Sequence, residues 1–132
     1  MLETRRLSEE PDAVAPDGSE IRLLSVGLRG GSMVHARVHP GGVTRPVRHR
    51  TVEEIWVCIA GRGRMWRRTA EGEGDGEITD LEPGVGVSIP ARTRFQFRCD
   101  GPDALEVVIA TVPPWPGDEE AVGCEGPWAP TV

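Results

Sequence analysis

Glycine and proline punctuate this chain at short intervals, and no other feature limits its fold as strongly. The sequence holds 17 Gly and 12 Pro, which are spread between short apolar runs along the chain. Both residues interrupt helices and long strands, so the segments between them are short. Short apolar runs separated by turn residues are typical of an all-β sandwich or barrel. The sequence therefore predicts an all-β fold.

The apolar runs predict the individual strands. No segment between residues 20 and 112 has a helical period with caps, so we expect no helix longer than about three turns there. The acidic, glycine-rich residues 70–76 predict a hairpin tip. Residues 104–112 form the most apolar run and should lie near the middle of a sheet. The expected strands are 20–26, 32–39, 53–60, 62–69, 77–82, 85–89, 95–98 and 104–112.

The length of the chain, 132 residues, fits one domain with a single core. We expect an N-terminal arm over residues 1–19, a barrel over residues 20–112 and a C-terminal tail over residues 113–132. The tail contains five prolines, so it cannot be a central strand. Because two exposed indoles are costly, Trp115 and Trp128 should anchor the tail on the barrel.

Charge and composition exclude several classes of partner. The net charge of −6 argues against nucleic acid, which usually selects a basic surface. No apolar run approaches the roughly 20 residues that span a bilayer, so no membrane partner is expected. The three cysteines form no C-x-x-C pair, which indicates neither a disulfide framework nor a zinc ribbon. We therefore expect reduced thiols and a cytoplasmic protein.

Residues 40–61 hold the candidate site. The stretch opens on Pro-Gly-Gly, closes at Gly61 and contains strand-forming residues between positions 55 and 59. His49, Glu53 and Glu54 lie close together where this strand begins, and Arg48 precedes His49 directly. A histidine and carboxylates at this spacing are either metal ligands or an ordinary charged rim.

Two motifs in this region resemble those of the cupin superfamily. The first is Gly, five residues, His-x-His, three or four residues, Glu, six residues, Gly, and Gly42, Glu54 and Gly61 match it. The second is Gly, five residues, Pro-x-Gly, two residues, His, three residues, Asn, and Gly84 and Pro90 match it. The resemblance implies a single-domain, all-β, double-sheet jelly-roll β-barrel.

Most metal-ligand positions of the family hold other residues here. The resemblance places Arg48 and Arg50 at the two histidine positions of the first motif. It places Phe95 and Cys99 at the histidine and asparagine positions of the second. Glu54 alone matches a ligand, and a catalytic divalent ion needs about three protein ligands. We therefore expect no cofactor and a metal-free preparation.

Strand parity suggests what replaces the metal. Along an extended strand Arg48 and Arg50 share the face of Glu54, so we expect an internal Arg–Glu pair, with a rim salt bridge as an equal alternative. His49 would then point to the opposite face. A register shifted by one residue would instead pair His49 with Glu53, and a β-bulge could bring it to Glu54. A divalent metal would then need ligands from other strands: His35, His39 or Gln96.

The strand 53–60 is apolar on both faces. Trp56 and Cys58 lie on one face, and Ile55, Val57 and Ile59 on the other. One face should fill the interior, while the other must be covered by the arm and tail or by a second subunit. Cupins commonly pair through this side of the sheet, so the resemblance implies a homodimer.

We therefore expect a small-molecule-binding protein with its pocket inside the barrel. The ligand would be a small organic molecule such as a carboxylate, which Arg92 and Arg94 could contact near the barrel mouth. Glu54 is the candidate catalytic residue for a metal-independent acid–base step. No residue is assigned as a metal ligand. The candidate ligand-binding residues are His39, Arg48, His49, Arg50, Trp56 and Phe95.

Two other functions stay open at this point. One is a metal-dependent cupin enzyme of the isomerase, cyclase or dioxygenase type, using His49 and Glu53 or Glu54. The other is a regulatory or structural module whose pocket is filled by its own side chains. Fold alone does not choose among them, but about one transition metal per chain would favour the metal enzyme.

Overall fold

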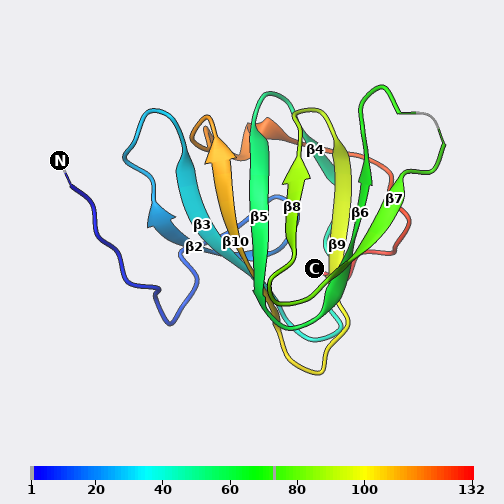
Figure 1. Cartoon of the computed structure of the whole chain (residues 1–132), viewed down its shortest axis with the longest axis horizontal. Coiled ribbons are helices and arrows are strands. Elements are labelled where there is room, and N and C mark those ends of the chain that lie inside the picture. Colours follow the sequence, from blue (N-terminus) through cyan, green and yellow to red (C-terminus); the bar gives the residue numbers. More distant parts are fainter. Residues whose placement is uncertain (1, 73) are drawn as a thin grey trace.

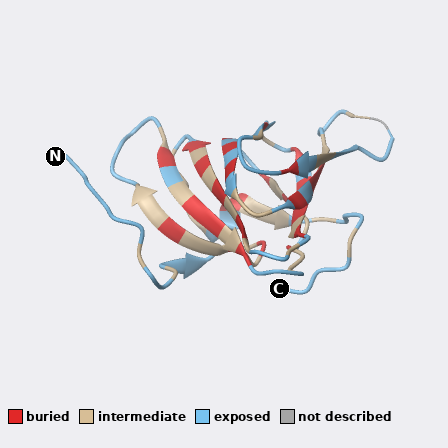
Figure 2. Ribbon diagram, turned by 60° about the horizontal axis from the view of Figure 1, so that its bottom comes forward, coloured by how far each residue is buried: buried red, intermediate tan, exposed pale blue. Residues whose placement is uncertain are grey.

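Buried and exposed residues alternate along the long strands, and this alternation defines the inside of the molecule. In β5 (Glu53–Ala60) Glu54, Trp56 and Cys58 are buried while their neighbours face outward. In β10 (Leu105–Val112) every second residue from Leu105 to Thr111 is buried. Figure 2 shows the resulting bands along these strands. A period of two places all the buried residues of a strand on one face, so each sheet has an inner and an outer side.

A computed structural model describes residues 2–72 and 74–132 and shows two antiparallel sheets that face each other (Figure 1). The first sheet has the order β1-β2-β3-β10-β5-β8 and the second the order β11-β4-β9-β6-β7. We call them sheet A and sheet B. The remaining strands of sheet A are β1 (Ala13–Val14), β2 (Glu20–Ser25), β3 (Ser32–Val38) and β8 (Gly86–Ile89). Those of sheet B are β11 (Ala121–Gly123), β4 (Val47–His49), β9 (Arg94–Cys99), β6 (Gly63–Arg68) and β7 (Glu77–Leu81).

The most apolar strand lies at the centre of sheet A, as the sequence predicts. Strand β10 pairs with β3 on one side and β5 on the other, with Val107 opposite Ala36 and Ile109 opposite Trp56. Its inner residues meet the inner residues of β6 and β9 across the interior, where Met65 and Phe97 are almost fully buried. This layer is the hydrophobic core of the protein.

The predicted double-sheet jelly-roll class is confirmed, although the two sheets do not close into a barrel over the described residues. Each predicted strand is present within a few residues of its expected bounds, and the described part of residues 20–112 contains no helix. The predicted hairpin joins β6 to β7, and Glu73 of its tip lies outside the described residues. No helix in the described chain is long and apolar enough to cross a membrane.

Three short strands were not predicted. Strands β1 and β11 belong to the chain ends, and β4 spans three residues between a proline-containing loop and a bend. Segments of two or three residues are too short for an alternating pattern to register. Strands β1 and β4 form because a longer neighbour, β2 or β9, offers a free edge. Strand β11 then pairs with the equally short β4.

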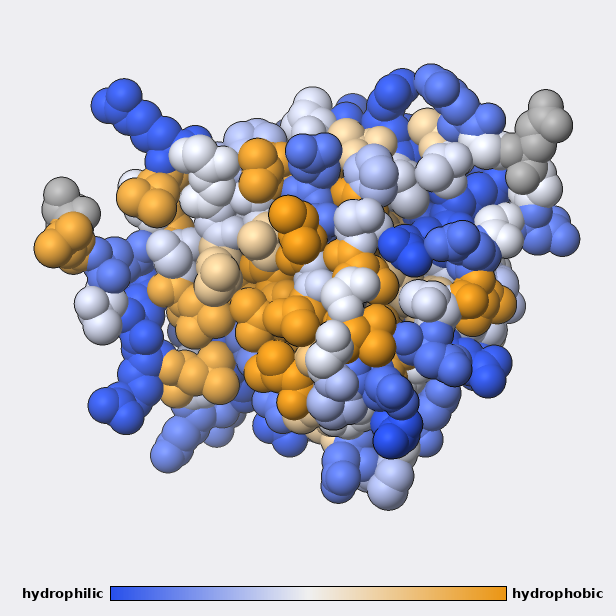
Figure 3. Space-filling model, viewed as in Figure 1, coloured by the Kyte–Doolittle hydropathy of each residue, from blue (hydrophilic) through white to orange (hydrophobic). Residues whose placement is uncertain are grey.

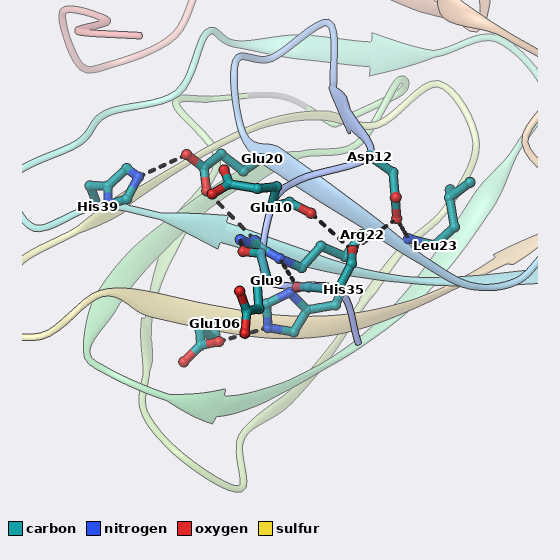
Figure 4. Close-up of polar contacts among 10 residues, drawn as sticks. Glu9, Glu10, Asp12, Glu20, Arg22, Leu23, His35, His39 and Glu106 are labelled. Carbon is teal, nitrogen blue, oxygen red and sulfur yellow. Dashed lines mark hydrogen bonds and ion pairs between the residues drawn. The ribbon is translucent and has the colours of Figure 1, made fainter. Parts of the chain in front are cut away.

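The N-terminal arm lies against sheet A at strand β2, near one edge of the sheet. Arg22 is buried there and donates from Nε to the carbonyl oxygen of Ser8 and from Nη2 to that of Glu9, at 2.8 and 2.7 Å. Beside it the buried His35 ring places Nε2 2.8 Å from Oε1 of Glu106 (Figure 4). The two hydrogen bonds from Arg22 hold the arm on this side of the sheet, and the His35–Glu106 contact joins β3 to β10 beside them.

The C-terminal tail packs on sheet B. Gln96, on the outer face of β9, donates from Nε2 to the Trp128 carbonyl oxygen at 2.8 Å and accepts from the Trp128 amide at 3.1 Å. The Arg98 guanidinium lies 4.5 Å from the centre of the Trp128 ring, in cation–π contact. Earlier in the tail, η1 (Asp118–Glu120) leads into β11, which pairs with β4.

Candidate functional site

A cavity of about 270 Å³ lies between the two sheets, and both chain ends help to enclose it. Its inner walls come from β2, β3, β5 and β10 of sheet A and from β4 and β9 of sheet B. The rest of its lining comes from residues 13–17 of the arm, from Ser19 and Val26 on either side of β2, and from Pro114, Trp115, Gly117, Asp118 and Ala121 of the tail. The walls are mostly apolar, and the side chains with polar groups are Asp17, Ser19, Ser32, His49, Glu54, Trp56, Thr111, Trp115 and Asp118.

His49 and Glu54 reach the cavity from opposite sheets. His49 ends β4 in sheet B, whereas Glu54 lies at the start of β5 in sheet A. Residues 50–52 form a bend between them, so the chain is not extended from 48 to 54. His49 Nδ1 lies 4.0 Å from Glu54 Oε2, and both side chains are buried.

The bend makes the predicted parity wrong. Arg48 and Arg50 do not share the inner face with Glu54, and neither lines the cavity. Arg48 stands opposite Arg94 in the neighbouring strand, and the exposed Arg50 donates from Nε to the carbonyl oxygen of Glu119 at 3.0 Å. The expected internal Arg–Glu pair is absent from the described residues, and His49 faces inward instead of outward.

Glu120 holds this bend in place from the tail. Its Oε1 accepts hydrogen bonds from the Thr51 amide and hydroxyl and from the Val52 amide, between 2.5 and 2.9 Å. Burial alone raises the pKa of Glu120, but these bonds outweigh it and leave the pKa below its ordinary value. The ionised carboxylate therefore fixes the segment that turns His49 toward Glu54.

Glu54 is a buried carboxyl group with few partners. The Trp56 indole Nε1 donates to its Oε1 at 3.0 Å, and Oε2 has no hydrogen bond to a described residue. Burial raises the pKa of Glu54 to about 7, with the Trp56 bond opposing this and the negative charge of Asp17 adding to it. A carboxyl with this pKa exchanges its proton near neutral pH, which suits a general acid or base.

His49 is held by aromatic rings. Its ring meets Phe95 at 5.1 Å and Trp115 at 4.9 Å between centroids, both edge to face. Burial lowers the pKa of His49 to about 4, although the nearby Glu120 charge acts in the opposite direction. The imidazole is therefore neutral at pH 7. Its Nδ1 is buried and has no hydrogen-bond partner among the described residues, which leaves a polar atom for a ligand to satisfy.

Asp17 is a second acid at the cavity. Its Oδ1 accepts from the Ser19 amide at 2.9 Å and from the Ser19 hydroxyl at 2.7 Å. Burial raises the pKa of Asp17, although the bonds from Ser19 and the charge of Arg45 act against it. The sequence offered no signal for this residue beyond a Pro-Asp-Gly turn, because its approach to Glu54 depends on how the arm packs.

The structure brings four of the seven predicted site residues together. Glu54, His49, Trp56 and Phe95 line the cavity. His39, like the two arginines, does not: its side chain is largely exposed and bonds from Nε2 to Oε2 of Glu20 at 2.8 Å (Figure 4). Arg92 and Arg94, expected near the mouth, are also absent from the lining.

Several lining residues were missed besides Asp17. Trp115 was expected to anchor the tail, and it reaches the cavity and contacts His49. Ser32 and Thr111 form a short hydroxyl–hydroxyl hydrogen bond, and Ser32 Oγ also accepts from the Trp115 amide at 3.1 Å. Residues 32, 111 and 115 carry no shared motif: the pairing of β3 with β10 brings Ser32 to Thr111, and the tail then brings Trp115 to Ser32.

The residues at the cavity do not fit the metal centre that the cupin fold implies. In the described chain, no three His, Cys, Asp or Glu side chains form a metal-binding group. His49 and Glu54 supply two donors, and Phe95 occupies the wall where a third ligand would be needed. His35 is on the outer face of sheet A with Glu106, and Gln96 is on the outer face of sheet B with Trp128. Two protein donors fall short of the usual three.

Proteins with similar sequences or folds come from several organisms. An uncharacterised protein of Methanocaldococcus jannaschii is 28% identical over 92% of this chain and 98% of its own length. The crystal structure of an uncharacterised conserved protein with a double-stranded β-helix domain, from Klebsiella pneumoniae, superposes with a TM-score of 0.62 at 19% identity, over 92% of this chain and 90% of that one.

An enzyme shares the fold as well. An oxalate decarboxylase structure superposes with a TM-score of 0.72 at 16% identity, over 90% of this chain but only 31% of that one. At these identities the structural matches show the fold alone. The sequence profile of the cupin domain (Cupin_2) matches residues 34–111, which is more than half of the chain and runs from β3 to β10. This protein therefore belongs to the cupin domain family.

Proposed function

We propose that this protein binds a small organic molecule in the cavity between its two sheets. One observation carries the proposal: a cavity of about 270 Å³ with apolar walls receives a few convergent polar groups, among them His49 and Glu54. Small-molecule sites in proteins are mostly apolar with few placed polar groups, and this volume lies at the low end of their range. The ligand is accordingly small, about the size of one ring with a short substituent.

The polar groups also suit metal-independent acid–base chemistry. Glu54 holds a proton that it can release near pH 7, and Trp56 orients the carboxyl through Oε1. His49 is neutral and offers an unpaired ring nitrogen as a hydrogen-bond partner. In such a reaction Glu54 is the catalytic residue, His49 binds the ligand, and Trp56 and Phe95 form the apolar wall.

A metal-dependent enzyme of the isomerase, cyclase or dioxygenase type is the second candidate. In such an enzyme the partner of His49 would be Glu54, whose Oε2 lies 4.0 Å from His49 Nδ1. Glu53 is excluded as the partner because it is exposed on the outer face. The enzyme requires at least one further ligand from outside the pair of His49 and Glu54. A module whose interior is filled by its own side chains is not supported, since the cavity is open space.

Binding is tested with benzyl alcohol, a neutral probe of the right size, by amide chemical-shift mapping. We expect shifts at residues lining the cavity, and their loss in Val34→Phe, which places a larger side chain at the lining. Ile78→Phe is the matched control, because Ile78 is exposed on β7 in the other sheet. Shifts that survive Val34→Phe unchanged, or shifts scattered over the surface, would refute a binding site in the cavity.

We also propose a homodimer formed through the outer face of sheet A. Apolar side chains gather there over β5 and β10 (Figure 3), and Ile55 and Ile59 are 62% and 48% exposed. The arm contacts the same sheet at strand β2, near its edge, and the tail residue Trp128 packs on sheet B, so neither contact involves β5 or β10. A compact apolar patch without internal charges packs well against an identical copy around a two-fold axis.

The state of the cysteines supports a cytoplasmic location as part of this proposal. Cys58, Cys99 and Cys124 are all free thiols, and the first two are buried. Free thiols persist in reducing compartments such as the cytosol.

A further inference from the structure

Apart from His49, the ionisable side chains that line the cavity are all carboxylic acids. Asp17, Glu54 and Asp118 are among its lining residues, and no arginine or lysine of the described chain is. The carboxyl groups of Asp17 and Glu54 are both buried, and Asp17 is near enough for its charge to act on Glu54. Arg45, which acts electrostatically on Asp17, directs its Nε to the carbonyl oxygen of Val132 and is not in the lining.

The remaining walls are rich in aromatic rings. Trp56, Phe95 and Trp115 line the same cavity, with the neutral His49 ring between Phe95 and Trp115. Trp56 and Phe95 meet edge to face at 5.9 Å between centroids. Tryptophan faces attract ammonium and guanidinium groups, and do so more strongly when water is excluded. Aromatic walls and carboxylate groups therefore both attract a cation.

We propose, as an extension of the proposed binding function, that the cavity selects a small organic amine in its ammonium form. Glu54 is the counter-ion, with Asp17 reinforcing it, and the rings of Trp56 and Trp115 contact the cationic head or its adjoining carbon atoms. This differs from the carboxylate expected from the sequence. That expectation involved Arg92 and Arg94, which the structure leaves out of the lining.

The number of protons released on binding depends on whether Glu54 is protonated before the ligand arrives. Without a ligand its carboxyl group is protonated below pH 7, because burial raises its pKa to about that value. An incoming ammonium ion favours the carboxylate, so Glu54 releases its proton to solvent and forms an ion pair. No covalent bond forms or breaks apart from the O–H bond of Glu54. Binding of an amine at pH 6 should thus release up to one proton, whereas binding of an alcohol should release none.

The test compares three probes of nearly equal shape: benzylamine, benzyl alcohol and benzoate. Binding to the whole protein is measured by calorimetry at pH 6 in two buffers that differ in ionisation enthalpy, which counts the protons released. We expect benzylamine to bind at least about tenfold more tightly than benzyl alcohol, with proton release, and benzoate to bind most weakly. Glu54→Gln should reduce the preference for the amine to a few-fold and abolish the proton release.

Each outcome separates this inference from the proposed function. Equal affinities for benzylamine and benzyl alcohol, or tighter binding of benzoate, would refute the amine preference while leaving a small-molecule site. Failure of all three probes to bind would refute both proposals. Since proton release is measured on the unmodified protein, the inference stays testable if Glu54→Gln does not fold. Asp17→Asn then serves as the second variant, with a smaller loss of amine preference expected.

Discussion

Replacing Glu54 by glutamine should change how the stability of the fold depends on pH. The pKa of this buried carboxyl is about 7 in the folded protein, against an ordinary value of 4.5. The folded state therefore holds the proton more tightly than the unfolded state does. The sign follows from this linkage: the contribution of Glu54 to stability is complete below pH 4.5 and is lost as the pH rises through about 7.

The size of the effect follows from the same two values. The interval from 4.5 to about 7 corresponds to about 3 kcal/mol, at roughly 1.4 kcal/mol for each pH unit. Glutamine has no proton to lose, so between pH 4.5 and 8 the parent should lose about 3 kcal/mol relative to the variant. His49 acts in the opposite direction, because its pKa is lowered from 6.5 to about 4 and its contribution disappears as the pH falls. This second effect is common to both proteins and cancels in their difference.

Urea unfolding at half-unit steps from pH 4.5 to 8, followed by tryptophan fluorescence, measures this difference in the free energy of unfolding. Glu53→Gln is the matched control, because Glu53 is the neighbouring residue but its side chain is exposed. Its profile should run parallel to that of the parent. If the Glu54→Gln profile also runs parallel to the parent, the carboxyl is not held protonated by burial and its role as an acid or base near pH 7 is wrong.

Four further predictions concern the rest of the molecule. Ile55→Glu should convert the dimer to a monomer in analytical ultracentrifugation, while Ile78→Glu, at a residue that is also more than half exposed but lies in sheet B, leaves it intact; a parent that is already monomeric would refute the dimer. Glu120→Gln should lower the free energy of unfolding in urea by about 2 kcal/mol, since two amides and a hydroxyl donate to its Oε1. A loss below about 0.5 kcal/mol would show that Glu120 does not stabilise the bend. Deleting residues 113–132 should lower stability by about 3 kcal/mol or more through its two tryptophans, and an unchanged melting temperature would show a loose tail. Metal analysis of the purified protein should find far less than one transition metal per chain; a full complement that disappears in His49→Ala would establish the metal enzyme.

Sequence patterns sufficed for the fold because turn residues separate the apolar runs that form its strands. Strand β5 was predicted at residues 53–60 and occurs at Glu53–Ala60, and β10 differs by one residue from its expected start. Both were predicted as apolar runs between turn residues, and the alternation of buried and exposed residues along them appears only in the structure. The spacing of Gly42, Glu54 and Gly61 matches a cupin motif, and this resemblance predicted how the strands are arranged in two sheets.

The site was harder to predict because its residues are far apart in the sequence and only tertiary contacts bring them together. The bend at 50–52 turns His49 inward, and it is stabilised by Glu120, about 70 positions later in the chain. Parity along a strand carries no information across such a bend, so Arg48 and Arg50 were assigned to the wrong face. Asp17 reaches the cavity with the arm, which no local pattern positions. Glu54, whose place is fixed by the regular part of β5, was predicted correctly as a lining residue.

The division of the cavity between the core and the chain ends has a consequence for how such a protein diversifies. Sheet A and sheet B supply walls that the hydrophobic core also needs, so changes there disturb folding. Lining residues in segments 13–17 and 114–118 lie outside the matched cupin domain. Insertions or substitutions in these two segments can reshape the cavity without altering the central strands β5, β9 and β10. A family built in this way can acquire new ligands by exchanging its ends while one scaffold is retained.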